Sequence, residues 1–415
     1  MAGRLRLRRR QGGDSAPDTK YGDRAGPARD PRQRHSAGVH GYRPRVRHTA
    51  ANTRHSSRRL SRHTRAGQAE HAGRHRARRG VPGIAGGSDD QRRVAARGRR
   101  TAGVVEDREF GSTGLKVTAL GLGGAPLSES CFADGVATIR HAIDAGLTYF
   151  DTSPLYGQGM SQAIYGTALS AQDTGFLFAT KLGHFRDPRL YRSPDALRAQ
   201  LHENLRLLRR ERVDLLQIHE ADFHSWWSDD GQGGRLQDGV DYDFDGAPVV
   251  EILREARDRG QCRFIGISGN TAGDMARVLQ ALDVDTCLMA FNYDLIWRGA
   301  REKVIPLARQ KGAALILGAI LQYGRFTQVR ADWLASPPDW MTEDVRERFV
   351  RLYDLQAESG LSLVELTVRF LLAEPAFATM LIGAATPVQL EESVAAARRG
   401  QLPADLHTRI EALGL

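Results

Sequence analysis

The sequence predicts an α/β fold, a (β/α)8 TIM barrel, for the roughly 310 residues that follow residue 104. Short apolar segments alternate with amphipathic helical segments along this region, which is the pattern of a parallel sheet covered by helices. A chain of this length is too long for most single hydrophobic cores but normal for one such barrel. Eight segments read as its strands: residues 119–122, 148–151, 176–181, 215–219, 264–267, 286–291, 314–317 and 379–382.

The segments between these strands carry helix signals. In segment 193–211, Ser193 can cap the first turn, Pro194 fits the first helical position, and leucines recur on one face that can pack on the sheet. Segment 361–375 repeats this periodicity, and Pro375 ends it. Both segments therefore predict helices of the outer layer.

A short pair of strands is expected before the first barrel strand, around residues 108–120. Ser112, Thr113 and Gly114 supply the residues of its turn. We expect this hairpin to plug the closed bottom of the barrel and to contribute stability.

Residues 1–104 are predicted to be a disordered Arg-rich extension, and residues 105–415 to form the barrel domain. The first 100 residues hold 26 arginines and one lysine against seven acidic residues, so they carry +20 and the remainder carries −10. Such a segment cannot bury enough apolar area to offset the entropy of ordering it. Three explanations stay open: an arm that binds nucleic acid or another polyanion, a passive solvated tail, or translation begun upstream of a true start near Val104 or Val105. Nucleic acid is the least favoured, since no repeated aromatic or RGG-like unit occurs.

Composition argues against several other classes of protein. No run of 18 apolar residues occurs, and no secretory apolar segment follows the basic start. Cys131, Cys262 and Cys287 are spaced for neither a disulfide framework nor a zinc site. The acidic run 229–245 fits no calcium-loop pattern and reads as solvated. We therefore expect a cytoplasmic protein without a membrane span or a metal.

Four polar residues stand at the ends of apolar runs: Asp151 and Tyr156 in TYFDTSPLYGQG, Lys181 in FLFATKLG, and His219 in VDLLQIHEAD. Because the carboxyl ends of barrel strands meet at one end, where active sites lie, we expect the four side chains to meet. A carboxylate, a phenol, an amine and an imidazole together can deliver a proton to a carbonyl oxygen at neutral pH. Each residue alone also has a purely structural explanation, so the prediction depends on their occurring together.

Each of the four has an expected role. The ammonium of Lys181 would lower the pKa of Tyr156, and Asp151 would pair with Lys181 so that it keeps its proton. His219 would donate a hydrogen bond to the substrate oxygen and set its angle.

At these motifs the chain resembles the aldo-keto reductase family, whose catalytic tetrad of Asp, Tyr, Lys and His occupies them in this order. The resemblance extends from REFGSTGLKVTALGLGG to LIGAATPVQLEESV, and within the family it is nearest to the aldose and L-galactose dehydrogenase branch. It implies an NAD(P)-dependent oxidoreductase that interconverts an alcohol or sugar lactol with its carbonyl or lactone form. Two alternatives stay open: a nicotinamide-binding redox sensor or regulatory barrel with little turnover, and a nucleic-acid-associated protein that works through its tail.

The resemblance also implies an NAD(P)H site that needs no Rossmann motif, and GLGGAP indeed fails the spacing of one. A loop that meets a helix N-terminus offers free amides and a positive dipole end to phosphate oxygens. In GISGN, AFNYDL and IGAATPVQLEES, the positions that match the family's carboxamide, phosphate and adenine contacts are Ser268, Asn292, Gly383, Thr386, Gln389 and Glu392.

This sequence departs from the family pattern at several cofactor positions. Gly269 replaces an Asn, Ile320 falls near the place where many members stack a Tyr on the nicotinamide, and Ser393 replaces another Asn. Ala384 and Ala385 lie where NADP-preferring members carry a Lys or Arg that grips the 2′-phosphate. The missing charge-assisted bonds predict tolerance of NAD, or even preference for it, and leave the choice between NAD and NADP open.

Two insertions, residues 221–246 and 321–349, follow the catalytic ends of the fourth and seventh strands and should overhang the pocket. Phe223, Trp226 and Trp227 in the first are placed to stack on the apolar face of a sugar ring. The equal alternative is a loop held down by its own aromatic residues. The expected partner is a small-molecule carbonyl or sugar substrate rather than a membrane or nucleic acid, and the sequence does not fix an oligomeric state.

Overall fold

The structure is a computed structural model that describes residues 105–169 and 175–415. Every described residue belongs to one compact unit. The extension predicted for residues 1–104 lies outside the described residues.

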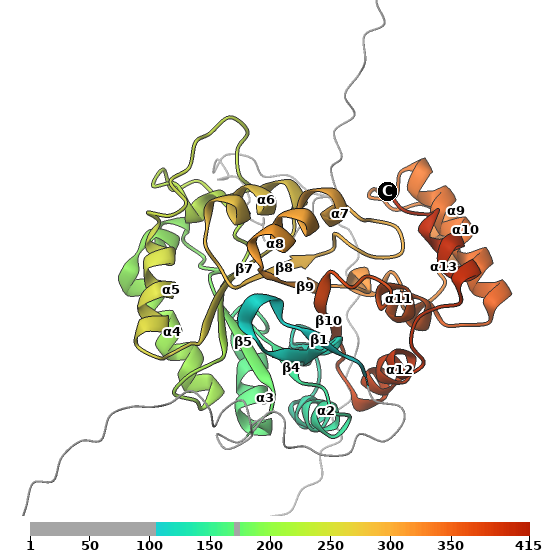
Figure 1. The fold of residues 1–415 in the computed structure, drawn as a ribbon, viewed down its shortest axis with the longest axis horizontal. Coiled ribbons are helices and arrows are strands. Elements are labelled where there is room, and N and C mark those ends of the chain that lie inside the picture. The colour runs from blue at the N-terminus through green and yellow to red at the C-terminus, as the bar shows by residue number, and fades with distance from the viewer. Residues whose placement is uncertain (1–104, 170–174) are drawn as a thin grey trace, which may run out of the picture. The chain divides into compact units, whose positions relative to one another are not determined.

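Eight parallel strands form a closed barrel in which each strand pairs with the next along the chain and the last pairs with the first (Figure 1). Every predicted strand occurs, with each end within two residues of its expected position. The fold class is therefore confirmed. The strands are β3 (Leu120–Gly123), β4 (Tyr149–Asp151), β5 (Leu177–Leu182), β6 (Leu215–Ile218), β7 (Phe264–Gly269), β8 (Thr286–Ala290), β9 (Ala314–Gly318) and β10 (Phe377–Gly383).

The strands are almost continuously apolar because both of their faces are covered. Alternate residues, among them Tyr149, Leu177 and Leu215, face the barrel interior and form one cluster. The opposite residues pack against the helices in a larger cluster. Because successive side chains alternate, the next interior positions on these strands lie two residues further on, towards the carboxyl ends.

The predicted hairpin is present and closes the other end of the barrel. Strand β1 (Asp107–Glu109) pairs antiparallel with β2 (Lys116–Thr118), and Gly114 takes a left-handed conformation at the turn. Phe110 and Val117 belong to the interior cluster, and the Phe110 ring lies 5.7 Å from the Tyr149 ring between their centroids. The hairpin thus adds its apolar side chains to the bottom of the barrel.

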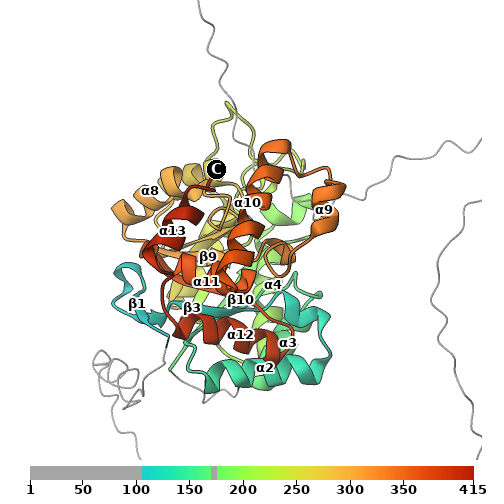
Figure 2. The ribbon, with the colours of Figure 1, turned by 90° about the vertical axis from the view of Figure 1, so that its right-hand side faces the viewer.

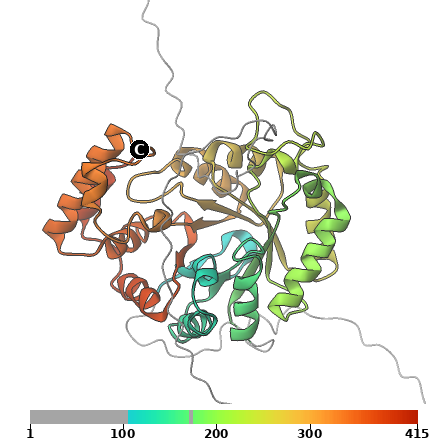
Figure 3. The same ribbon diagram turned by 180° about the vertical axis from the view of Figure 1, so that it is seen from behind.

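Helices surround the strands, as the views from the front, the side and behind show (Figures 1, 2 and 3). The predicted helix at 193–211 is α4, for which Ser193 accepts a hydrogen bond from the amide of Ala196. The predicted helix at 361–375 is α11, capped by Ser362. The helices are α2 (Phe132–Asp144), α3 (Met160–Ala168), α4 (Pro194–Leu208), α5 (Pro248–Asp258), α6 (Ala272–Ala281), α7 (Ala300–Lys303), α8 (Ile305–Lys311), α9 (Ala331–Ala335), α10 (Glu343–Ser359), α11 (Leu363–Leu371), α12 (Pro387–Arg398) and α13 (Ala404–Glu411).

The insertion after β9 contains α9 and the start of α10, a long helix that the sequence reading had not assigned. Both helices lie with α13 outside the ring that covers the barrel (Figure 1). Trp340 joins an aromatic cluster with Trp297, Trp333 and Phe349, and the Arg325 guanidinium lies 4.1 Å from its ring centroid. Much of this insertion therefore packs on itself rather than over the strand ends.

The C-terminal helix is held by a buried arginine. Arg298 donates to the carbonyl oxygens of Ile410 and Glu411 at the end of α13, at 2.9 and 2.7 Å, and to those of Asp294 and Leu295 in the loop after β8. Only 5% of Arg298 is exposed, so these carbonyl groups depend on it for their hydrogen bonds. No helix among residues 105–169 and 175–415 is long and apolar enough to cross a membrane.

Replacing Arg298 by Leu should lower the free energy of unfolding by about 3 kcal/mol, because buried carbonyl oxygens lose their donor and the Glu411 carboxylate loses one of its two arginine partners. Urea denaturation measures this change. The control is Arg409→Leu, which removes an exposed ion pair with Glu358 and should cost less than about 1 kcal/mol. Equal losses in the two variants would contradict the role given to Arg298.

Candidate active site

A buried ion pair lies at the carboxyl ends of β4 and β5. Lys181 donates a short hydrogen bond to Oδ1 of Asp151 and a second one, of 3.0 Å, to the Thr152 carbonyl. Gln217 on β6 donates to the other Asp151 oxygen at 2.9 Å. Asp151, Lys181 and Gln217 each follow an interior apolar residue by two positions, which is why all three side chains point into the barrel.

Burial dominates the electrostatics of this pair. Lys181 and Asp151 are each 1% exposed. Burial raises the pKa of Asp151 and lowers the pKa of Lys181, while the attraction between the two groups opposes both shifts. Each charge therefore depends on the other to offset the cost of its burial.

Tyr156 lies in the loop after β4, against the same lysine. The Lys181 Nζ atom is 5.3 Å from the centroid of the Tyr156 ring. The His219 ring meets the Tyr156 ring edge-on, with 5.8 Å between centroids and an interplanar angle of 87°. The structure thus brings together all four residues of the predicted tetrad.

The pKa of Tyr156 shifts in the direction opposite to the one expected. Burial raises this pKa well above its ordinary value, and Asp151, Glu220 and Tyr323 add to the rise. The nearby Lys181 ammonium favours the phenolate, but burial outweighs it and the Asp151 carboxylate opposes it. In this structure Tyr156 therefore keeps its proton at neutral pH, the state of a proton donor.

His219 is a neutral imidazole held at both its backbone and its ring. Burial lowers its pKa well below the ordinary value, and the neighbouring His184 and Lys181 lower it further. The Ser153 hydroxyl lies 2.8 Å from His219 Nδ1. The indole N–H of Trp226 donates to the His219 carbonyl at 3.1 Å.

Several residues of this site were missed by the sequence reading. His184 follows β5, and its ring centroid lies 4.2 Å from that of His219. Its Nε2 is 3.0 Å from Oε2 of Glu220, and Asn270 donates to the other Glu220 oxygen at 2.6 Å. Two of the missed residues had a signal in the sequence. Gln217 stands two positions before His219 on the same strand face, and Glu220 directly follows His219.

The first insertion places its aromatic residues differently from the prediction. Trp226 is fully buried and Trp227 is 5% exposed, and the indole N–H of Trp227 donates to the Ala221 carbonyl at 2.8 Å. Neither ring is free to stack on a sugar, so for these two residues the alternative of a loop held down by its own aromatics is correct. Phe223 is half-buried and lies 6.0 Å from the His184 ring between centroids, which leaves it next to the site.

The predicted carboxamide contacts lie at the end of β7 and in the loop after β8. Ser268 donates to the Ile218 carbonyl at 3.0 Å. Asn292 donates its amide hydrogens to the carbonyls of Ala290 and Asn270, at 2.6 and 2.5 Å. Ser268 can therefore only accept further hydrogen bonds, and Asn292 offers its amide oxygen, so both fit the N–H groups of a carboxamide.

Close packing explains one departure from the family pattern. A Cβ added at Gly269 would approach the Met275 sulfur to 2.3 Å and Oδ1 of Asp222 to 2.8 Å. The second Asp222 oxygen accepts hydrogen bonds from the amides of Asn270 and Thr271, at 2.9 and 2.8 Å. Met275 and the hydrogen-bonded Asp222 carboxylate therefore leave no room for a side chain at position 269.

The loop after β9 carries an exposed aromatic residue three positions after Ile320. Ile320 is buried, whereas Tyr323 is 58% exposed and lies 4.5 Å from the Phe291 ring between centroids. Phe291 and Tyr323 both have positive φ angles, of 63° and 53°. Such backbone conformations are uncommon outside glycine and often mark functional sites.

The segment after β10 has the form expected of a phosphate site. Gly383 is exposed at the strand end, and Thr386 caps α12 by accepting from the amide of Gln389. The side chains of Gln389 and Glu392 take part in internal bonds, accepting from the Ala385 amide and the Ser362 hydroxyl, each at 2.8 Å. The first turn of α12 stays open to solvent, where its amides and dipole suit phosphate oxygens.

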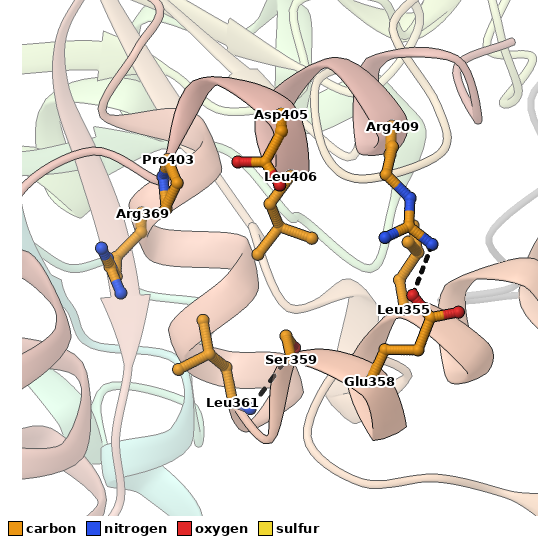
Figure 4. A pocket seen from close by; sticks show the side chains of 9 residues that line it. All are labelled: Leu355, Glu358, Ser359, Leu361, Arg369, Pro403, Asp405, Leu406 and Arg409. Atoms are coloured by element: carbon orange, nitrogen blue, oxygen red, sulfur yellow. Dashed lines mark hydrogen bonds and ion pairs between the residues drawn. The ribbon is translucent and has the colours of Figure 1, made fainter.

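A cavity of about 390 Å³ lies elsewhere, among α10, α11 and α13 (Figure 4). Three of the four charged residues that line it are paired: Arg409 with Glu358, and Arg369 with Glu365 and two carbonyl groups. None of the predicted site residues lines it. No cluster of three or more His, Cys, Asp or Glu residues suited to a metal occurs in the described part of the chain.

Comparison with known proteins identifies the family of this chain. The sequence model of the aldo/keto reductase family matches residues 119–414. L-galactose dehydrogenase of Arabidopsis thaliana is 27% identical over 325 residues, which cover 75% of this chain and 91% of that protein. D-threo-aldose 1-dehydrogenase of a Pseudomonas species is 23% identical over 316 residues, which cover 68% of this chain and 90% of that protein.

Solved structures share the fold. The holo form of an aldo-keto reductase from Bacillus halodurans has a TM-score of 0.58 and 23% identity, with coverage of 74% of this chain and 96% of that one. A glycerol dehydrogenase from Gluconobacter oxydans has a TM-score of 0.57 and 23% identity, with coverage of 74% and 94%. The chain belongs to the aldo/keto reductase family, and it is accordingly an NAD(P)-dependent oxidoreductase.

Removing one partner of the buried pair should cost more stability than removing both. Asp151→Asn leaves the Lys181 ammonium without a countercharge and should lower the free energy of unfolding by about 3 kcal/mol. The double variant Asp151→Asn/Lys181→Met should recover at least half of that loss, because no uncompensated charge remains. Urea denaturation compares the two variants.

The control for this comparison is Glu203→Gln, which breaks an exposed pair with Arg206 and should cost less than about 1 kcal/mol. A double variant that is less stable than the single one would mean that Lys181 contributes through packing rather than through its charge.

Proposed function

We propose that this chain interconverts an alcohol or sugar lactol with its carbonyl or lactone form by hydride transfer, with Tyr156 as the acid and base. The observation that carries the proposal is the meeting of Tyr156, His219 and the Lys181–Asp151 pair at one end of the barrel. The nicotinamide cofactor of the family supplies the hydride or accepts it.

The residues of the site would donate the proton, stabilise the phenolate and orient the substrate oxygen. Tyr156 enters the reduction direction as a protonated phenol, able to give its proton to the carbonyl oxygen as hydride arrives at the carbon. The positive Lys181 beside its ring favours the phenolate that this transfer leaves behind, and Asp151 keeps that lysine charged. The neutral His219 can donate to the same oxygen and fix its direction.

The cofactor would be held at the rim of the barrel by its two ends. Ser268 and Asn292 would accept from the carboxamide N–H groups, and the segment from Gly383 to the first turn of α12 would take the phosphate oxygens. Gln389 and Glu392 would support that segment through their internal bonds.

The names of two relatives favour polyhydroxylated substrates for this chain. L-galactose dehydrogenase and D-threo-aldose 1-dehydrogenase carry sugar substrates in their names. Phe223, half-buried beside His184 at the edge of the site, would supply an apolar surface to a sugar ring. A small carbonyl compound or a sugar is therefore the substrate class that we propose.

Replacing Tyr156 by Phe should lower kcat by about 10²-fold or more while cofactor binding persists, because only the proton donor is removed. The assay offers aldoses with NAD or NADP and, in the reverse direction, simple aldehydes with the reduced cofactors. Absorbance of the reduced nicotinamide follows the reaction.

The matched control is Tyr165→Phe, which removes a buried hydroxyl bonded to the Leu122 carbonyl and should keep kcat within about threefold. Activity near wild type in Tyr156→Phe would rule out the assigned role. Tight cofactor binding without any turnover by the wild type would instead favour a sensor.

Adding a cation at position 385 should move the cofactor preference towards NADP. From Gly383 to Glu392 the sequence holds no Lys or Arg, so a 2′-phosphate meets no cation from this segment. Ala385→Arg should raise the ratio of kcat/KM for NADP to that for NAD by about tenfold or more. Ala404→Arg, an exposed alanine at the start of α13, is the control and should leave the ratio unchanged. An unchanged ratio in Ala385→Arg would place the 2′-phosphate elsewhere.

A further inference from the structure

Ser153 is a fully buried hydroxyl two residues after Asp151, and it touches the imidazole of His219. Its Oγ lies 2.8 Å from His219 Nδ1. The amide of Leu155 donates to the same oxygen at 3.1 Å. The serine oxygen is thus already an acceptor, and its own hydrogen still needs a partner.

The available donors and acceptors indicate that the Ser153 hydroxyl donates to the imidazole of His219. Among the described residues, the Ser153 hydroxyl hydrogen has one acceptor within reach, His219 Nδ1. If Nδ1 instead carried a hydrogen and donated it, the Ser153 hydroxyl would be a buried donor without a partner. That arrangement is disfavoured by the cost of an unsatisfied buried group.

The doubly protonated imidazole is disfavoured as well. Burial and the neighbouring Lys181 and His184 all lower the pKa of His219. With neutral His219, a hydrogen bond accepted at Nδ1 leaves the single ring hydrogen on Nε2.

Nε2 is the ring nitrogen that can meet a substrate. No group among the described residues bonds to it, and it is not among the fully buried unpaired atoms, so it stays open. The same ring packs edge-on to Tyr156, the proposed proton donor. A hydrogen on Nε2 therefore gives the site a second donor beside the tyrosine hydroxyl.

We propose that Ser153 is a positioning residue that donates to Nδ1 of His219 and fixes the tautomer with the hydrogen on Nε2. Its effect on catalysis rests on the function proposed above, in which His219 donates to the substrate oxygen, whereas its effect on the tautomer does not. Without the serine hydroxyl, the two neutral tautomers become closer in free energy, and part of the enzyme would present a lone pair to the carbonyl oxygen.

The first test is the protonation pattern of His219 in the full-length protein labelled with ¹⁵N-histidine. Long-range proton–nitrogen NMR spectra distinguish the two neutral tautomers, and the signal that disappears in His219→Gln identifies this residue. The wild type should show hydrogen on Nε2 and none on Nδ1. Ser153→Ala should show a mixed or reversed pattern, and Ser153→Thr, which keeps the hydroxyl, should restore the wild-type pattern.

The second test is kinetic. Ser153→Ala should lower kcat/KM for aldehyde reduction by about tenfold, and Ser153→Thr should recover it to within about threefold. The control is Ser161→Ala, which removes another buried hydroxyl, bonded to Thr152 and the Gly124 carbonyl, without touching His219. It should leave the His219 tautomer unchanged.

The outcomes separate the two proposals. A wild-type spectrum with hydrogen on Nδ1, or an unchanged pattern in Ser153→Ala, would overturn the inference even if Tyr156-dependent turnover is found. A tautomer that depends on Ser153 would support it even in a protein that reduces no aldehyde, in which case the proposed function alone fails.

Discussion

The site depends on the buried ion pair between Lys181 and Asp151. Two charges are removed from water where β4 and β5 end, which costs desolvation free energy. Their attraction offsets this cost, because Gln217 and the Thr152 carbonyl complete their hydrogen bonds. The pair sits at the top of the apolar interior cluster, so its position follows from the pleat of neighbouring strands. A slip of one residue between these strands would turn one of the two side chains to the outer face of the barrel and separate the charges.

That pair determines the chemistry of its neighbours. Lys181 favours the phenolate of Tyr156, but burial outweighs it in the resting site and keeps this phenol protonated. The lysine becomes important when negative charge develops on the tyrosine oxygen, because the favourable interaction then grows. His219 complements it: burial keeps the ring neutral, so the ring can act as a directed hydrogen-bond donor rather than as a second cation.

The loops around the site have roles that composition alone did not reveal. Trp226 and Trp227 fasten the backbone beside His219 instead of facing a substrate, and Asp222 fastens the loop that follows Ser268. The insertion after β9 forms its own aromatic cluster outside the ring of helices, while Tyr323 and Phe291 stand exposed or half-buried at the rim. Rigid fastening of this kind holds donors and acceptors in place before a substrate arrives.

Sequence patterns were enough to predict the barrel, its eight strands, the hairpin and the meeting of Asp151, Tyr156, Lys181 and His219. Strand and helix periodicities are local, and parallel strands bring their carboxyl ends together in any closed barrel, so these features need no knowledge of distant contacts. Other features became visible only in the folded chain: which aromatic rings are buried, the raised pKa of Tyr156, and the gathering of Ser153, His184 and Glu220 around His219. Burial and hydrogen-bond pairing arise between segments far apart in the chain, and the pKa of a group depends on the charges and the solvent that those contacts leave around it.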